Sequence, residues 1–78
     1  MKRISLTREV NGHTRYYKIV LSKTLFGEYG VERVYGAEMN KKPTGHKQNF
    51  FETIESAMRC FDDILKTKYA KGYSLPHF

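Results

Sequence analysis

The chain has 78 residues, with 14 Lys and Arg against 8 Asp and Glu, so its formal net charge is +6. A chain of this length buries one small core, which predicts a single domain over residues 1–78 and excludes two. Hydrophobic residues make up 40% and aromatic residues 14% of the chain, which is too apolar for a disordered protein.

The first part of the chain predicts a β-hairpin. Apolar and polar side chains alternate in residues 3–10, which indicates a strand. Asn11-Gly12 then favours a two-residue turn, because both residues tolerate positive φ. Residues 14–21 are rich in β-branched and aromatic types and predict the returning strand. We expect the core face to carry Ile4, Leu6, Tyr17, Ile19 and Leu21, and the other face to carry Tyr16, Lys18 and Val20.

A loop with an apolar pair is expected next. Residues 22–27 break the alternation and place Leu25-Phe26 beside a glycine. Two interpretations stay open. Exposed, the two side chains would offer an apolar contact to a protein partner. Folded back, they would cover the edge of the core.

Residues 29–35 predict a third strand whose orientation the pattern leaves open. Val31 and Tyr35 compete with Val34 for the interior, because the two sets lie on opposite faces of a strand. Gly36 is expected to end this strand or to allow a bulge.

The remainder predicts a fourth strand and a helix. A polar turn at 40–45 leads to a short strand at 46–51. The period then changes to that of a helix over 54–71, with Thr53 as N-cap and Gly72 in the left-handed conformation that closes the helix. The expected apolar stripe of this helix contains Ile54, Ala57, Met58, Phe61, Ile64, Leu65 and Tyr69.

These elements predict an α+β domain. Four antiparallel strands form a meander sheet, and one C-terminal helix packs across it. The helix must cover the sheet, because a lone meander leaves its apolar face in water.

The residue types and spacings do not predict catalysis. His13, His46 and His77 are scattered, and no pair has the spacing that places two imidazoles on one helix face for zinc. Cys60 lies at the border of the apolar stripe and is interpreted as a partly buried filler. Asp62-Asp63 point about 100° apart on a helix, so they form a solvated face rather than a catalytic pair. We expect no enzyme activity, no catalytic residue, no cofactor and no metal.

The compartment is inferred from absent signals. A single cysteine cannot form an internal disulfide. No apolar run approaches the roughly 20 residues of a membrane span, and residues 1–5 lack the apolar segment of a signal peptide. We expect a cytoplasmic protein without membrane contact.

Basic residues suggest a surface for an anionic partner. Several flank the polar turn, where exposed backbone amides also favour phosphate. Tyr16 and Tyr35 would offer stacking surfaces if they lie on the uncovered side of the sheet. A solvated basic turn with tyrosines that only cover the sheet is the alternative, and it stays open. The candidate nucleic-acid contacts are Lys18, Arg33, Tyr35, Lys41, Lys42 and Lys47.

The order of elements and several residues resemble the WGR domain, a module of poly(ADP-ribose) polymerases and of many bacterial proteins. The resemblance covers residues 16–73. The matching strands are 16–21, 31–37 and 49–51, and the matching turn ends at Gly45. In the helix the matching parts are its start at 53–57, Phe61 in its interior, and Lys68-Tyr69-Ala70-Lys71-Gly72-Tyr73 at its end.

The signature itself differs. Where the family shows Trp-Gly-Arg, this chain has Tyr35-Gly36-Ala37. The resemblance implies a non-catalytic, bacterial-type module, and in the polymerases this strand and its surroundings contact DNA and neighbouring domains. Ala37 cannot make the charge-assisted phosphate contact of an arginine.

We therefore expect a small module that binds nucleic acid, in particular DNA. It would contact the backbone phosphates and read the bases little. The alternative is a protein-interaction module that docks on a larger partner through Leu25, Phe26 and the sheet edge.

Overall fold

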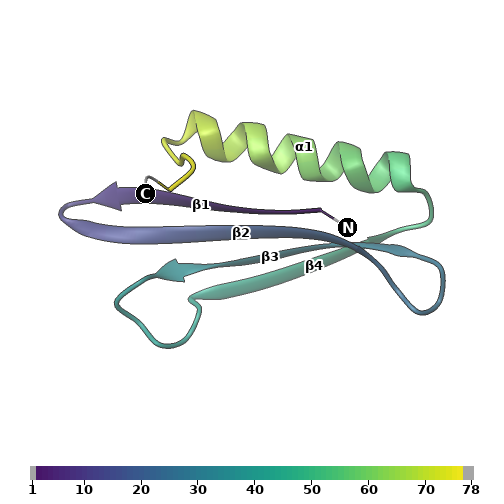
Figure 1. Ribbon diagram of the computed structural model, residues 1–78, viewed down its shortest axis with the longest axis horizontal. Coiled ribbons are helices and arrows are strands. Elements are labelled where there is room, and N and C mark those ends of the chain that lie inside the picture. The colour runs from purple at the N-terminus through teal and green to yellow at the C-terminus, as the bar shows by residue number, and fades with distance from the viewer. Residues whose placement is uncertain (1, 77–78) are drawn as a thin grey trace.

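The computed structural model describes residues 2–76, so His77, one of the three scattered histidines, lies outside the described residues. Four strands form one antiparallel sheet in the order β1-β2-β3-β4, and a single helix follows them (Figure 1). The predicted α+β architecture is confirmed. The elements are β1 (Lys2–Val10), β2 (His13–Lys23), β3 (Tyr29–Ala37), β4 (Gly45–Phe51) and α1 (Ile54–Ala70).

The first hairpin forms around the predicted turn. Val10 pairs with His13, and the two residues between them, Asn11 and Gly12, have φ values of 52° and 81°. This is the positive-φ geometry that a two-residue hairpin turn needs. Strand β2 continues to Lys23, two residues beyond its predicted end, because Ser22 and Lys23 still pair with Gly30 and Tyr29 of β3.

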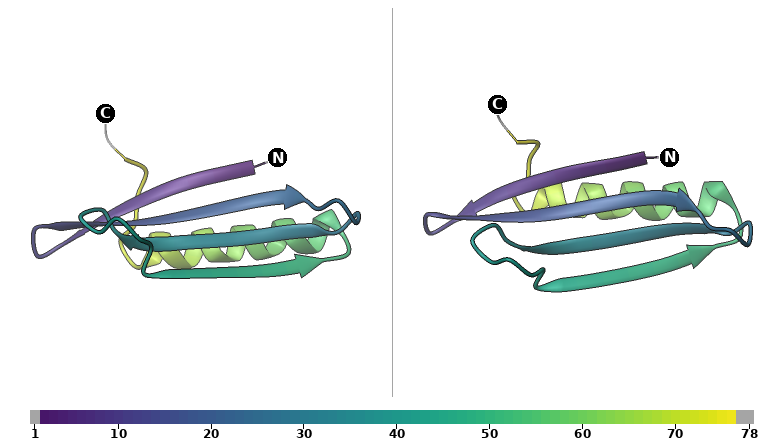
Figure 2. Two further views of the ribbon diagram at one scale, coloured as in Figure 1. Left: turned by 90° about the horizontal axis from the view of Figure 1, so that it is seen from below. Right: turned by 60° about the horizontal axis from the view of Figure 1, so that its bottom comes forward.

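The helix lies along one face of the sheet, over β2, β3 and β4, and leaves the other face uncovered (Figure 2). All of the predicted core-face residues of the hairpin point to the helix: four are buried, and Ile4 packs at the margin. The buried core consists of Leu6, Tyr17, Ile19, Leu21, Val31, Ala57 and Phe61.

Strand β3 resolves the orientation that the pattern left open. Val31 is fully buried and pairs with Leu21, and Tyr35 pairs with Tyr17, so both face the helix. Val34 lies on the uncovered face.

The expectation that Gly36 ends β3 or forms a bulge is wrong. Gly36 lies inside the strand and pairs in register with Tyr16. A Cβ at this position would lie 2.9 Å from the backbone N of Thr44 and 3.1 Å from the Tyr16 hydroxyl. The glycine therefore lets the turn between β3 and β4 pack closely against β3. The pairing of β3 with β2 continues through Gly36 without a break.

Helix α1 begins at its predicted cap and ends one residue early. The Thr53 hydroxyl accepts a hydrogen bond from the Ser56 N–H at 3.2 Å, and Lys71 is the C-cap. Gly72 follows with φ 99°, as predicted. Met58 and Tyr69, both placed in the apolar stripe, are 40% and 44% exposed. They lie at one margin of the stripe, where the sheet does not reach.

After the helix the chain returns to the sheet and covers part of its edge. The backbone of Ser74 exchanges two hydrogen bonds with that of Thr7, at 2.8 and 2.9 Å. This bridge lies on the side of β1 that faces away from β2. The other edge strand, β4, has no such cover in the described residues.

Replacing Phe61 by alanine should cost about 3–5 kcal/mol, because the ring is 1% exposed and its removal leaves a cavity between helix and sheet. The loss is measured as a change in the free energy of urea-induced unfolding. Met58→Ala, on the exposed margin of the same helix, is the control. Equal losses for the two variants would contradict the packing described.

Candidate functional site

The helix-facing side of the sheet changes character along its length. Near the turn between β2 and β3 it is apolar. Toward the other end, the same alternation that places Leu6 and Tyr17 in the core places Arg8 and Arg15 on the same face. Arg33 occupies the position between Val31 and Tyr35. Charged side chains therefore point toward the helix, where an apolar core would otherwise continue.

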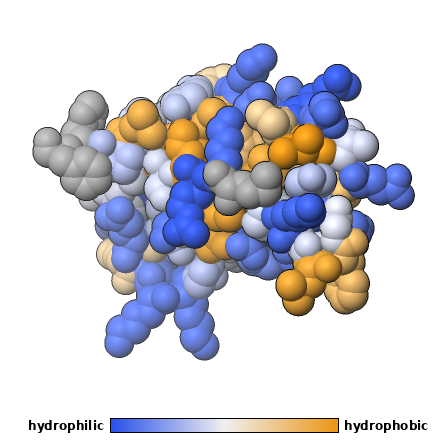
Figure 3. All heavy atoms as spheres, turned by 45° about the vertical axis from the view of Figure 1, so that its right-hand side comes forward, coloured by the Kyte–Doolittle hydropathy of each residue, from blue (hydrophilic) through white to orange (hydrophobic). Residues whose placement is uncertain are grey.

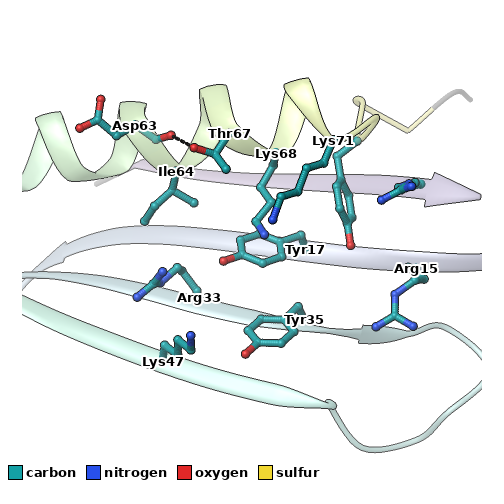
Figure 4. A pocket seen from close by; sticks show the side chains of 12 residues that line it. Arg15, Tyr17, Arg33, Tyr35, Lys47, Asp63, Ile64, Thr67, Lys68 and Lys71 are labelled. Carbon is teal, nitrogen blue, oxygen red and sulfur yellow. Dashed lines mark hydrogen bonds between the residues drawn. The ribbon is translucent and has the colours of Figure 1, made fainter.

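These side chains line a groove between the sheet and the C-terminal half of α1, with a volume of about 540 Å³ (Figure 4). We call it the basic groove. Six of its lining residues are cationic and one, Asp63, is acidic, so the lining carries +5 of the chain's net charge of +6. The cations are Arg8, Arg15, Arg33, Lys47, Lys68 and Lys71.

The floor of the basic groove is aromatic. The rings of Tyr17 and Tyr35 stack with centroids 5.2 Å apart and planes 9° apart. Tyr73, beyond the helix, meets Tyr17 edge-on at 5.9 Å. The ammonium of Lys68 lies 4.4 Å from the centroid of the Tyr17 ring. Figure 4 shows Lys68 reaching from the helix toward this ring.

Gly45 determines where the Tyr35 ring lies. The two residues pair across β3 and β4, and any Cβ at Gly45 would overlap the ring and hydroxyl of Tyr35. The ring therefore leans over bare backbone on one side and stacks on Tyr17 on the other. A side chain at residue 45 would push the ring out of this position.

Arg33 is held in place and left without a counter-ion. Its Nη2 donates a hydrogen bond to Oδ1 of Asn49 at 2.9 Å, while its buried Nε–H has no acceptor in the described residues. A buried donor of this kind is costly unless an acceptor is provided.

The described residues supply no ion pair to any cation of the groove. Within residues 2–76, Lys2 pairs with Asp62 at 3.8 Å, and His46 Nε2 lies 2.7 Å from Glu32 Oε2; both contacts lie outside the groove. Burial lowers the pKa of Lys68, and the neighbouring charges of Lys71, Arg33 and Lys47 lower it further. The groove is therefore a site of uncompensated positive potential.

The structure brings together three of the predicted nucleic-acid contacts. Arg33, Tyr35 and Lys47 line the basic groove. Lys41 and Lys42 are exposed in the turn that leaves the Tyr35 end of β3. Lys18 lies on the opposite face of the sheet, with its ammonium 5.5 Å from the ring of Tyr16.

Nine of the twelve lining residues were not predicted as site residues from the sequence. Three cations among them share one signal, a charged type at a position whose period points it inward. Arg8 and Arg15 continue the inward alternation of β1 and β2, and Lys68 lies seven residues after the buried Phe61, which places it on the same helix face. The lining residues that were not predicted are Arg8, Arg15, Tyr17, Asp63, Ile64, Thr67, Lys68, Lys71 and Tyr73.

The apolar pair between β2 and β3 is fully exposed. Leu25 is 101% and Phe26 89% exposed, so the interpretation that they fold back over the core is wrong. The Thr24 hydroxyl accepts hydrogen bonds from the Phe26 and Glu28 N–H groups, both at 3.2 Å, and these bonds hold the turn away from the sheet. Figure 3 shows apolar side chains standing out among hydrophilic ones at this end of the molecule.

The remaining candidate chemistry is modest. Cys60 is half-buried beside the core, and burial raises the pKa of its thiol, which fits a filler rather than a nucleophile. Among residues 2–76, no three His, Cys, Asp or Glu side chains gather as metal ligands would. No helix in the same range has the length and apolar content needed to cross a bilayer.

Lys68 makes stability depend on pH. Its pKa is lowered from the ordinary 10.5, so the unfolded chain binds more protons than the folded chain as pH rises toward that value. The charged amine therefore destabilises the fold at neutral pH, and the penalty disappears as pH passes from the folded to the unfolded pKa. Relative to Lys68→Gln, the parent chain should gain unfolding free energy as the pH rises toward 10.5 in urea titrations. A difference that stays flat or falls would contradict this.

The family model for the WGR domain matches residues 2–77, essentially the whole chain. No curated protein and no solved structure matches the chain. The match extends the resemblance seen in residues 16–73 to include β1, which contributes Arg8 to the basic groove. The chain belongs to the WGR domain family.

Proposed function

We propose that the protein is a non-catalytic module that binds nucleic acid, in particular DNA. The sugar-phosphate backbone of the nucleic acid would lie in the basic groove. One observation carries the proposal. Six cations converge on a groove that holds one carboxylate, and none of them forms an ion pair within residues 2–76. Membership of a family associated with nucleic-acid binding supports the same function.

The side chains fit phosphate better than they fit base edges. Arg33 lines the groove with a guanidinium that has no ion pair within residues 2–76, and a guanidinium matches two phosphate oxygens. Lys47 and Lys71 are exposed at the groove and act as more mobile charges. These contacts carry no sequence information, so binding follows the backbone rather than the bases.

Tyr35 supplies the aromatic surface of the site. It stands where the family has tryptophan, and its position over Gly45 leaves the ring at the open side of the groove, toward β4. A sugar or base that reaches the groove would pack against this ring. Lys41 and Lys42, in the adjoining turn, extend the positive surface beyond it.

The arginine missing from the signature has a neighbour that supplies the same charge. Ala37 pairs directly with Arg15 across β2 and β3, so the two side chains share the helix-facing side. Arg15 lines the groove. The guanidinium lost at residue 37 is therefore replaced from the next strand, at the same end of the groove.

Lys47→Gln should weaken binding to duplex DNA and reduce the slope of log K against log salt by about 0.9 if Lys47 neutralises one phosphate. Fluorescence anisotropy at several salt concentrations measures both quantities. Lys18→Gln removes the same charge from the opposite face and should leave the slope unchanged. Equal effects of the two variants would indicate a diffuse attraction instead of the groove. No binding by the parent chain at low salt would exclude the function.

A second candidate function is docking on a protein partner through Leu25 and Phe26. The observation that favours it is their near-complete exposure on a turn fixed by hydrogen bonds, with Phe50 of β4 also 53% exposed. Phe26→Ala should abolish capture of such a partner in a pull-down and leave DNA binding unchanged. DNA binding that falls with this variant would place the turn in the nucleic-acid interface.

A further inference from the structure

Lys68 differs from the other cations of the groove because it is an amine held inside it. Its side chain is half-buried, its Nζ lies over the Tyr17 ring, and it forms no ion pair within residues 2–76. Charged and titratable groups from every element around the groove line it together with Lys68. They are Asp63 and Lys71 of α1, Arg8 of β1, Arg15 and Tyr17 of β2, Arg33 and Tyr35 of β3, Lys47 of β4, and Tyr73.

The contact with the Tyr17 ring stabilises the ammonium form of Lys68, and two other features of the groove oppose that form. Removal from water and the nearby positive charges both act against the ammonium, and its pKa is lowered. The neutral amine is the form that attacks carbonyl carbon. At a given pH, a larger fraction of Lys68 is therefore in the neutral, nucleophilic form than for a fully solvated lysine.

The same cations concentrate small anions beside this amine. An acyl phosphate carries its electrophilic carbonyl one oxygen away from a phosphate dianion. Arg33, Lys47 and Lys71 line the same groove as the amine, so a phosphate held by them would bring the carbonyl carbon toward it. The cations also stabilise the charge on the departing phosphate, as fixed positive groups do for developing anions.

We propose that Lys68 is a site of direct acylation by acyl phosphates captured in the basic groove. The lone pair of Nζ forms a bond to the carbonyl carbon. The bond between that carbon and the bridging oxygen breaks, and its electron pair leaves with phosphate. The proton lost from nitrogen passes to the phosphate, so an amine and an acyl phosphate give an amide and hydrogen phosphate.

Acylation would change the groove. It removes one positive charge, and the amide no longer repels Lys71, Arg33 and Lys47. The acylated chain should therefore bind nucleic acid more weakly and resist unfolding better at neutral pH. Only the first of these consequences depends on the proposed function; the reaction itself needs no nucleic acid.

The experiment compares acylation rates at individual lysines of the intact chain. The protein is incubated with acetyl phosphate at several pH values, and acetylation at each lysine is quantified by peptide mass spectrometry. Lys66, on the exposed side of the same helix, is the internal reference. A parallel reaction with p-nitrophenyl acetate, an uncharged acyl donor, reports the reactivity of the amine without anion capture.

With acetyl phosphate, Lys68 should react several-fold faster than Lys66, and this preference should exceed the one seen with the neutral ester. Inorganic phosphate and Lys47→Gln should both reduce the rate at Lys68 with acetyl phosphate and leave that at Lys66 unchanged. Equal rates at the two lysines, or the same preference with both donors, would overturn the proposal. If Lys68 reacts as expected in a chain that does not bind DNA, the acylation site stands and the nucleic-acid function fails.

Discussion

The structure depends on one helix covering a sheet face that is only partly apolar. Leu6, Ile19, Leu21 and Val31 give α1 a dry surface at one end, and Phe61 packs there. At the other end the same face presents arginines and a lysine to Lys68. The apolar contacts hold the helix in place against the repulsion at the cationic end, since like charges in a partly desolvated groove destabilise the folded state.

This division explains why the groove stays open. Long cationic side chains reach from the sheet and the helix toward the same space, and their mutual repulsion is not offset by a counter-ion within residues 2–76. The stacked tyrosines form a firm floor beneath them. The site thus combines stacked aromatic rings with charged side chains around them. Repulsion among these charges lowers the stability of the folded chain, and an anion bound between them would raise it again.

The fold was predictable because strand alternation, the Asn11-Gly12 turn and the helical stripe are local signals that agree with one another. The site was only partly predictable, since Arg33, Tyr35 and Lys47 were identified as cations and an aromatic near a turn, without their common groove. Arg8, Arg15 and Lys68 were missed because an inward charge looks like an error in an apolar pattern. Whether such a position is a flaw or a site depends on which strands and helix residues face it, and that is a property of the tertiary register.

The two edges of the sheet also differ in how they meet other chains. Ser74 covers part of β1 with its own backbone, whereas β4 leaves its outer hydrogen-bonding groups open. Lys47 lies in the middle of this open strand, and a second strand added there would have to bury or displace its ammonium. A lysine on an edge strand is a recognised obstacle to such pairing. The residue that enlarges the positive groove therefore also discourages the module from polymerising edge to edge.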